Sequence, residues 1–261
     1  MNLKSLNTLK QGQHVLGALL VVLVVWQGMV LFGGWNQALF PSPWQTLKGF
    51  EELLADGTLQ RDIFDSLRRF FIGYISSVII AMALGLVLGW YQKVWAYLNP
   101  IAQVLRPVSP TAWLPFIVLF FGIGEMPALV IIFIAAFFPV LLSTVSAVAT
   151  IEPVYLKVAQ NFGIRQPQLL TKIILPAIFP RIANGIHLAL GTAWVFLVAG
   201  EMVGAQSGLG FLIMDARNNL RADMLMAAII TIGVLGLILD TIVKMLESRI
   251  YKIWGIQERK D

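Results

Sequence analysis

Two long runs without a charged residue constrain the fold more than any other feature of this chain. They are Val15–Phe32 and Phe70–Trp90. A helix needs about 20 apolar residues to cross the ~30 Å hydrocarbon core of a bilayer, and both runs are close to that length. Because 58% of all residues are hydrophobic and only 13% are charged, the remainder of the chain is also unsuited to a water-soluble globule. The sequence therefore predicts an integral membrane protein.

Six stretches are long and apolar enough to be membrane-spanning helices. The predicted spans are Val15–Phe32, Phe70–Trp90, Val94–Phe121, Pro127–Thr150, Phe179–Gly200 and Met224–Leu246. No small-x-small cleavage site follows the first of them, so it is expected to be a retained helix and not a signal peptide. The expected fold is an all-α bundle of six transmembrane helices.

Positive charge is concentrated on one side of these spans. With a cytoplasmic amino terminus, most lysines and arginines fall inside, and the positive-inside rule then predicts both termini in the cytoplasm. Residues 1–40 become a cytoplasmic tail with the first helix, 41–69 an external amphipathic segment, 70–247 the core with a cytoplasmic loop at 152–176, and 248–261 a cytoplasmic tail. Arg68 and Arg69 fall outside, where the neighbouring Asp62 and Asp65 are expected to offset them.

Composition excludes several kinds of function. The chain has no cysteine and only two histidines, so disulfides and thiolate chemistry are excluded and no metal site is expected. The net charge of +5 comes from residues at helix ends instead of a basic patch, so no nucleic-acid partner is expected. No internal repeat, which marks many secondary transporters, is visible.

One polar stretch, residues 157–176, interrupts the apolar spans with the sequence KVAQNFGIRQPQLLTKIILP. Val154, Val158 and Phe162 recur at four-residue spacing and share one face of a predicted short helix. Gly163 can take the left-handed conformation that ends such a helix. A second helix is expected to follow, so that the pair presents an apolar side that fits a groove in another protein. An amphipathic connector resting on the membrane surface is the alternative.

This stretch resembles a known motif. The spacing from Gly163 to the I-x-L-P ending is similar to the EAA coupling loop of ABC importer permeases, in which the loop docks into a separate ATPase subunit. Residues 105–121 (LRPVSPTAWLPFIVLFF) and 191–213 (GTAWVFLVAGEMVGAQSGLGFLI) also resemble permeases of the nitrate, sulfonate, taurine and bicarbonate importers. The likeness covers most of the chain from about Ser66 onward. One departure is Lys157, which stands where the family has a Glu, so a salt bridge from that Glu is not carried over.

The resemblance implies a type I ABC importer (MetI-like) permease fold with a cytoplasmic coupling helix in a bacterial cytoplasmic membrane. Its implied partners are two ATPase subunits, a second copy of the permease in a homodimer, and an external solute-binding protein. ATP and Mg would be bound by the ATPase, because this chain lacks a G-x-x-x-x-G-K-[ST] phosphate loop and is not itself an enzyme. The residues implied in coupling are Lys157, Val158, Ala159, Phe162, Gly163, Leu169, Ile173, Leu175 and Pro176.

The family's solutes are nitrate, bicarbonate, taurine and alkanesulfonates, and a pyrimidine precursor of thiamine is the alternative within the same class. From the residues, two other classes of function remain open. A gradient-driven secondary transporter needs paired ionisable groups at mid-bilayer, and among these spans only His187 is ionisable near the middle. An intramembrane serine protease would use His187 and Ser207, but Ala205 occupies the place where that class has glycine.

Three prolines interrupt the third predicted span: Pro107, Pro110 and Pro115. Each removes a backbone donor, and in lipid the freed carbonyls are tolerated only where they meet protein or a watery cavity. The segment is therefore predicted to line a solute pathway, with Arg106 as an attractive charge near the inner mouth. The candidates there are Arg106, Ser109, Thr111 and Trp113. A kink in a packed helix, with Arg106 snorkelling to the interface, is the alternative.

The remaining pathway candidates lie in or just after the fifth predicted span: Asn184, His187, Glu201, Gln206 and Ser207. An acid in the membrane is a functional candidate, but a carboxylate repels an anion, so Glu201 is expected to shape the outer mouth or simply to be solvated. Asn184 and His187 are expected to face the pore or to bond a neighbouring helix. Asp240 is expected to pair with Lys244, one turn later.

Overall fold

A computed structural model describes residues 3–36, 39–151, 154, 157, 159, 161–164 and 168–254. Within these residues all regular structure is helical, which confirms the all-α prediction. The elements are α1 (Leu3–Phe32), α2 (Pro43–Ala55), α3 (Thr58–Trp90), α4 (Gln92–Leu105), a 3-10 turn (Pro110–Trp113), α5 (Leu114–Phe121), α6 (Met126–Ala149), a π-helix (Leu169–Ile174), α8 (Leu175–Gly204), α9 (Leu209–Asn218) and α10 (Ala222–Trp254).

Four of the described helices, α3, α6, α8 and α10, are long and apolar enough to cross a membrane. The pair formed by α4 and residues 110–121 makes a fifth candidate if its two arms are one span. In α1, residues 17–32 form a shorter apolar helix. These helices lie at the positions of the six predicted stretches. That all six cross the membrane stays a prediction.

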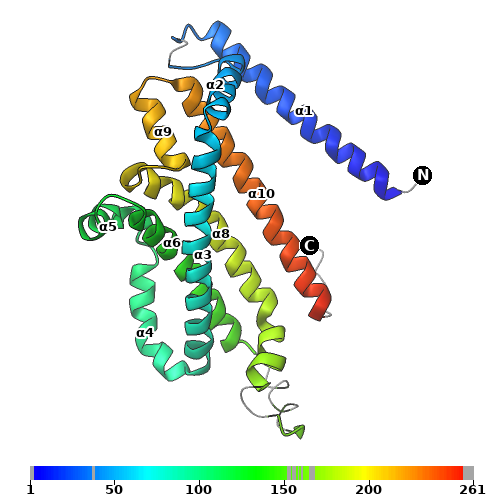
Figure 1. The fold of residues 1–261 in the computed structure, drawn as a ribbon. Helices are drawn as coiled ribbons and strands as arrows, with labels where there is room; N and C mark the ends of the chain where they lie inside the picture. Colours follow the sequence, from blue (N-terminus) through cyan, green and yellow to red (C-terminus); the bar gives the residue numbers. More distant parts are fainter. Residues whose placement is uncertain are drawn as a thin grey trace. The chain divides into compact units, whose positions relative to one another are not determined.

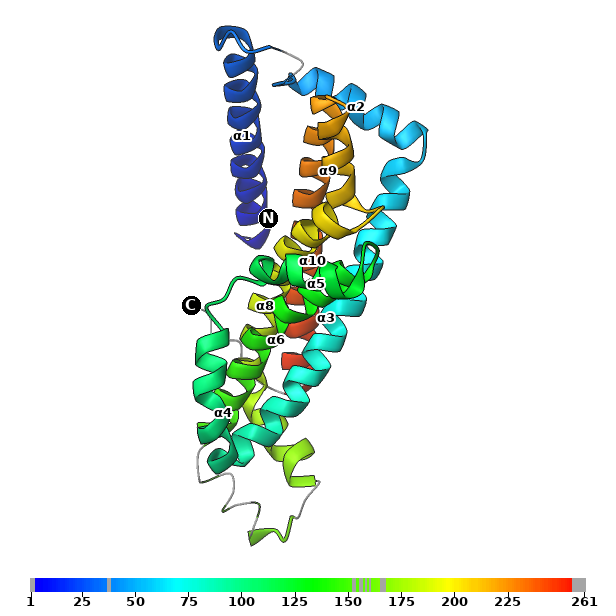
Figure 2. The ribbon, with the colours of Figure 1, turned by 90° about the vertical axis from the view of Figure 1, so that its left-hand side faces the viewer.

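The third predicted span is broken where its prolines lie. The helix α4 ends at Leu105, and the chain bends by 85° before residues 110–121 continue, as the crossing of α4 and α5 in Figure 2 shows. Pro110 and Pro115 stand in the first turns of the two short helices that follow, where a missing backbone donor is tolerated. The predicted interruption is thus confirmed.

The helix α3 begins at Thr58, well before the predicted start of the second span at Phe70. The polar residues of its first turns explain the difference. Asp62, Ser66 and Arg69 are only 1%, 0% and 2% exposed, so these polar side chains of the predicted external segment point into the protein.

The chain divides into two compact units, of which the first contains residues 1–61 and 212–231. In this unit, Ser42 and Gln45 form a capping box that starts α2, since each side chain accepts a bond from the other's backbone N–H. The indole of Trp26 donates to the Pro41 carbonyl at 3.0 Å and ties α1 to the start of α2. Arg221 contacts Glu52 at 2.6 Å, an exposed ion pair between α2 and the residue before α10.

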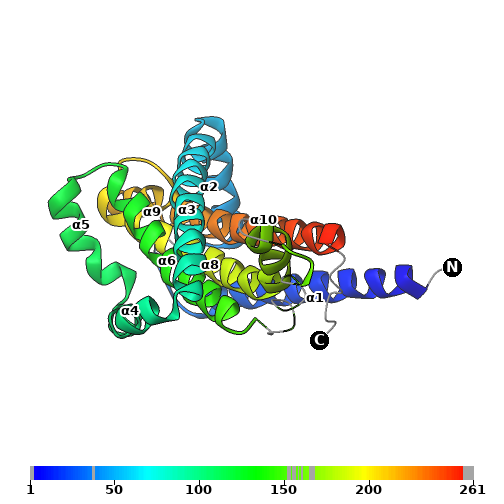
Figure 3. The ribbon, with the colours of Figure 1, turned by 90° about the horizontal axis from the view of Figure 1, so that it is seen from below.

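The second unit, residues 62–211 and 232–261, holds the main hydrophobic core. In it α6 packs against both α8 and α3 (Figure 1), and α3 also contacts α8 directly, where the rings of Phe70 and Trp194 lie edge to face. Small residues allow this close approach, because a Cβ at Gly73 or Gly200 would lie 2.9 or 2.7 Å from isoleucine side chains of α6. Trp194 fixes α10 to α8 by donating to the Ile232 carbonyl at 3.1 Å. Seen along its length, this unit has α4 and α5 on one side of the packed helices (Figure 3).

Candidate functional site

The second unit contains a cavity of about 840 Å³ between α4, α6 and α8. Its walls combine aromatic and aliphatic side chains with nine polar ones. The polar lining residues are Gln92, Asn99, Gln103, Arg106, Ser143, Ser146, Arg181, Asn184 and Thr192. A mostly apolar cavity that carries polar side chains among apolar helices has the form of a solute site in a membrane protein.

The helix α4 supplies one wall through a regular stripe. Gln92, Trp95, Asn99, Gln103 and Arg106 all line the cavity, and their spacing of three or four residues places them on one face of the helix. This stripe was visible in the sequence as polar side chains at helical intervals, and the sequence prediction missed all of it except Arg106.

The charge of the cavity has one sign. Two arginines, Arg106 and Arg181, line it, and none of the described lining residues is acidic. Arg106 directly follows α4, about 20 Å along the helix from Gln92 at 1.5 Å per residue. The side of the membrane on which each end of α4 lies is itself an expectation, so the position of Arg106 near the inner mouth stays a prediction. Arg181 lines the cavity from near the start of α8.

The other predicted pathway residues are distributed as follows. Asn184 lines the cavity with Arg106. Ser109 and Thr111 lie at the bend after α4, where their hydroxyls are 2.7 Å apart, and Trp113 packs its ring edge-to-face on Phe116. These three are absent from the cavity lining, although the adjacent Val108 and Pro110 contribute to it.

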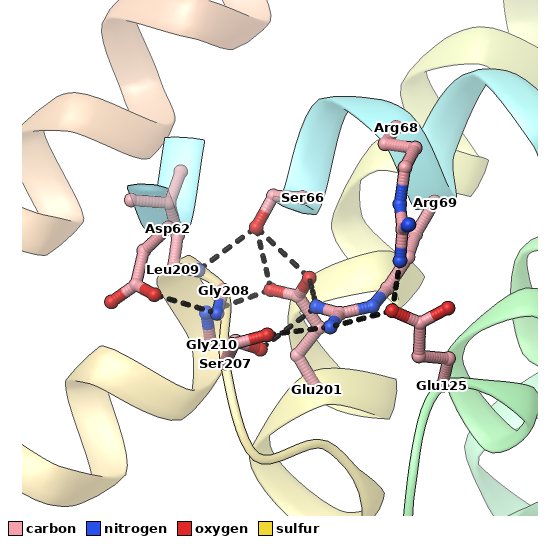
Figure 4. Close-up of polar contacts among 10 residues, drawn as sticks. All are labelled: Asp62, Ser66, Arg68, Arg69, Glu125, Glu201, Ser207, Gly208, Leu209 and Gly210. Carbon is pink, nitrogen blue, oxygen red and sulfur yellow. Dashed lines mark hydrogen bonds and ion pairs between the residues drawn. The ribbon is translucent and has the colours of Figure 1, made fainter. Parts of the chain in front are cut away.

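Glu201, another predicted pathway residue, lies in a buried polar junction, defined here as Asp62, Ser66 and Arg69 of α3, Glu201 of α8 and residues 207–210 (Figure 4). Its carboxylate accepts bonds from Arg69 Nη1 at 2.9 Å and from the Gly210 N–H at 2.9 Å, and the Ser66 hydroxyl lies 2.8 and 2.9 Å from its two oxygens. The side chain is 0% exposed. Plain solvation of Glu201, one of the two sequence interpretations, is therefore wrong.

The same junction holds the turn between α8 and α9. Arg69 donates to the carbonyl and the hydroxyl of Ser207 at 2.8 and 2.7 Å, and Asp62 accepts from the Gly208 N–H at 3.1 Å. Gly208 has φ +103°, which favours glycine. Gln206, in the same turn, is exposed. All these bonds fix the turn against α3.

The arginine pair in α3 meets acids from other helices. Arg69 pairs with Glu201 of α8, and Arg68 pairs with Glu125 at the start of α6. The charge of the pair is therefore offset by acids from distant parts of the sequence as well as by the expected neighbours Asp62 and Asp65.

A third polar cluster joins α8 to α10. His187 Nε2 lies 2.8 Å from Asp240 Oδ1, and its Nδ1 lies 3.6 Å from Glu247 Oε1. Asp240 also pairs with Lys244 at 2.8 Å, as predicted. The expectation that His187 bonds a neighbouring helix is thus confirmed, and its side chain and that of Asp240 border a smaller groove of about 430 Å³.

The predicted coupling segment differs from the buried clusters in its exposure. Among its described residues, Lys157 is exposed, Phe162 is 77% exposed, and Ala159 is buried. The Ile164 N–H donates to the Ala159 carbonyl at 2.9 Å, and Gly163 has φ +65°. This bond across five residues with a left-handed glycine is the Schellman ending that Gly163 predicted. Val158 lies outside the described residues.

The second part of the segment packs onto the bundle. Leu169 and Leu175 border a hydrophobic cluster formed by residues of α6 and α8 together with Ile174. Ile173 is partly buried, and Pro176 stands in the first turn of α8. The segment is therefore anchored at residues 169–176, while Phe162 offers an apolar ring to the surroundings.

The long apolar helices define a multi-pass membrane protein. Comparison with known proteins gives the family. Residues 81–252 match the model of the family described as binding-protein-dependent transport system inner membrane component. The chain belongs to this family, and it is a permease of the ABC transporter type.

Two relatives illustrate its members. The taurine transport system permease protein TauC of Escherichia coli (strain K12) is 32% identical over 90% of this chain and 87% of its own. The nitrate import permease protein NrtB of Synechocystis sp. (strain PCC 6803) is 33% identical over 88% of this chain and 86% of its own. Among solved structures, the MetNI methionine ABC transporter in an inward-facing conformation aligns with a TM-score of 0.59 at 20% identity, over 76% of this chain and 96% of that chain. That likeness confirms the MetI-like fold.

Proposed function

We propose that this chain is the membrane subunit of an ATP-driven importer for a small organic or inorganic anion, a sulfonate such as taurine or an alkanesulfonate, or an oxyanion such as nitrate or bicarbonate. The observation that carries the proposal is the cavity with two arginines and no acid among its described lining residues. An anion that leaves water needs donors and positive charge to replace its hydration. The similarity to permeases named for taurine and nitrate supports the same class of solute.

The energy would enter through the segment 154–176. This chain has no phosphate loop, so ATP and Mg would be held by two copies of a partner ATPase, and a homodimer of the permease would form the full pathway. Phe162 would fill a groove of the ATPase by helix-in-groove recognition. An external solute-binding protein would deliver the anion, and nucleotide-driven movement of the segment would switch the cavity between the two sides of the membrane.

In this proposal both chain termini and the coupling segment face the cytoplasm, in agreement with the positive-inside distribution of lysine and arginine. The inner end of the cavity is then the end with Gln92 and Arg181, and Arg106 lies deeper in the membrane.

A gradient-driven carrier is the second candidate, and one observation favours it. The contact of His187 with Asp240 supplies the intramembrane pair of ionisable groups that such carriers use. The family membership favours the ATP-driven importer.

Uptake into proteoliposomes tests the proposal. The chain would be reconstituted with its ATPase, with the solute-binding protein outside and ATP in the lumen, and uptake of labelled taurine, butanesulfonate, nitrate and bicarbonate would be followed. We expect at least one of these anions to accumulate only with hydrolysable ATP. Accumulation driven by an ion gradient without ATP would favour the carrier, and uptake of a thiamine-precursor pyrimidine alone would exclude the anion specificity.

The role of the coupling segment has its own test in Gly163→Val. A Cβ at Gly163 would meet nothing within 4 Å, so the substitution acts through the backbone conformation alone. We expect loss of ATPase association or of uptake, with the permease still folded. The control is Gly233→Val in α10, a second glycine with open space around it but without a positive φ. Unimpaired uptake by Gly163→Val would contradict the coupling role.

A further inference from the structure

Arg181 connects the cavity to the base of the coupling segment. It lies near the start of α8 and lines the cavity one turn before Asn184. Its Nη1 donates to the hydroxyl of Thr150, the residue that ends α6. Residues 150 and 181 flank the coupling segment in the sequence, so this bond joins the two ends of the helices that carry it.

Thr150 is itself tied to the cavity wall. Its hydroxyl donates to the Ser146 carbonyl at 2.9 Å, and Ser146 lines the cavity. A movement of the segment that shifts the end of α6 relative to the start of α8 therefore changes the position of the Arg181 guanidinium at the inner end of the cavity.

The guanidinium keeps most of its capacity for an anion. Within the described part of the chain its side-chain partner is a neutral hydroxyl, and no ion pair with a carboxylate is formed. A guanidinium has five N–H donors in a planar fork that matches an oxyanion or sulfonate. Arg106, at the far end of α4, has the same charge, and within the described residues no bond joins its side chain to the coupling segment.

We propose that Arg181 is the inner binding station for the transported anion, and that its bond to Thr150 links the occupancy of this station to the position of the coupling segment. The inference rests on the proposed function. Coupling of this kind is reciprocal: the segment position that exposes the Arg181 donors binds the anion more tightly, and bound anion favours that position by the same factor.

The test is ATP-driven uptake by the complete reconstituted importer carrying Arg181→Gln, Arg181→Lys or Thr150→Val. A charge-assisted hydrogen bond is worth about 1.5–3 kcal/mol, so Arg181→Gln is expected to raise the KM for the anion by roughly 10- to 100-fold. Arg181→Lys keeps the charge and is expected to recover much of this loss. Thr150→Val removes the hydroxyl at nearly constant volume, and it is expected to leave KM within about twofold while lowering the number of anions moved per ATP.

The matched control is Arg249→Gln on α10, an exposed arginine expected on the same side of the membrane and absent from the cavity lining. Its KM should equal that of the wild type. Where Arg181→Gln fails to assemble, the comparison of Arg181→Lys with the wild type replaces it, because a binding station predicts a change in KM even for this conservative variant.

An unchanged KM in an assembled Arg181→Gln complex would overturn the binding station. An unchanged number of anions per ATP in Thr150→Val would overturn the link to the coupling segment. Both results differ from failure of the proposed function, in which the wild-type complex itself takes up no anion with ATP.

Discussion

The buried polar junction around Glu201 and the coupling segment around Phe162 place their side chains in opposite ways. At the junction, charged groups are withdrawn from the surroundings, and Glu201 and Arg69 are 0% and 2% exposed. In the coupling segment an aromatic ring is presented to the surroundings, since Phe162 is 77% exposed. A chain that folded only for stability would place these groups the other way round.

The difference indicates a division of work within the second unit. The junction ties α3, α8 and the α8–α9 turn together through a network in which each carboxylate oxygen of Glu201 has donors. Such networks hold one arrangement, because any rearrangement leaves a buried charge without a partner. Among the described residues of the coupling segment before Leu169, Lys157 and Phe162 are exposed. We interpret the junction as the fixed part and the segment as the part that a partner moves.

The largest loss of stability should come from a substitution that breaks the buried polar junction. In Glu201→Gln the buried Arg69 loses its buried counter-ion and keeps only the half-exposed Glu125 at 3.6 Å, and removing one member of a buried pair costs about 3–5 kcal/mol. We expect a loss of this size in the free energy of unfolding, measured by denaturant titration in micelles. The control is Glu125→Gln, whose half-exposed carboxylate contacts Arg68 and lies 3.6 Å from Arg69, and it should cost less than about 1 kcal/mol because Glu201 still pairs with Arg69. Equal losses in the two variants would contradict the distinction.

The turn that the junction holds gives the next largest effect. Gly208→Ala would place a Cβ 2.5 Å from Glu201 Cδ and 2.7 Å from Arg69 Nη1, at a φ of +103°. Such backbone strain alone costs about 1–3 kcal/mol, and the displaced ion pair adds to it. Gly57→Ala is the matched control, with φ +78° and open space around the Cβ. If the two variants lose the same free energy of unfolding, the junction is not tightly packed around Gly208.

The half-buried contact of His187 with Asp240 should give a smaller loss of stability than the two changes at the junction. His187→Leu removes the bond to Asp240, and interhelical hydrogen bonds in membranes are worth about 0.6–2 kcal/mol. The measurement is the free energy of unfolding of His187→Leu with and without Asp240→Asn. Non-additive losses are expected because the two side chains are in contact, and strictly additive losses would show that the contact contributes nothing.

The exposed pair Arg221 with Glu52 should give the smallest effect of the ion pairs. Its hydrogen bond to Arg221 lowers the pKa of Glu52. Because the pKa is lowered in the folded state, the ion pair contributes fully to the free energy of unfolding above the ordinary pKa of a glutamate. This contribution is lost as the pH falls through the lowered value. Glu52→Gln should therefore barely change the free energy of unfolding at neutral pH. It should also abolish the small decrease in this free energy that the wild type shows as the pH falls. A loss as large as that of Glu201→Gln would contradict the role assigned to burial.

The sequence predicted the parts of this protein that depend on local patterns. Apolar runs gave the positions of the helices, the prolines gave the break after Leu105, and Gly163 gave the left-handed end of the first coupling helix. The spacing of Asp240 and Lys244 gave their ion pair.

What the sequence did not predict depends on contacts between distant segments. Arg69 and Glu201 are separated by 132 positions, and nothing in either neighbourhood indicates that they meet. Arg181 was not among the predicted pathway residues, because its place in the cavity follows from the packing of α8 against α6. The polar stripe of α4 could have been found, because its spacing is a local pattern.

The most direct test of the account is cross-linking from the coupling segment. The chain has no cysteine, so Phe162→Cys carries a single thiol, and Phe120→Cys in α5, whose ring is 70% exposed, is the matched control. The account predicts that in membranes containing the assembled transporter a short thiol-reactive cross-linker joins Phe162→Cys, but not Phe120→Cys, to the ATPase subunit. Intact ATP-driven uptake with no cross-link from position 162 to the ATPase would contradict it.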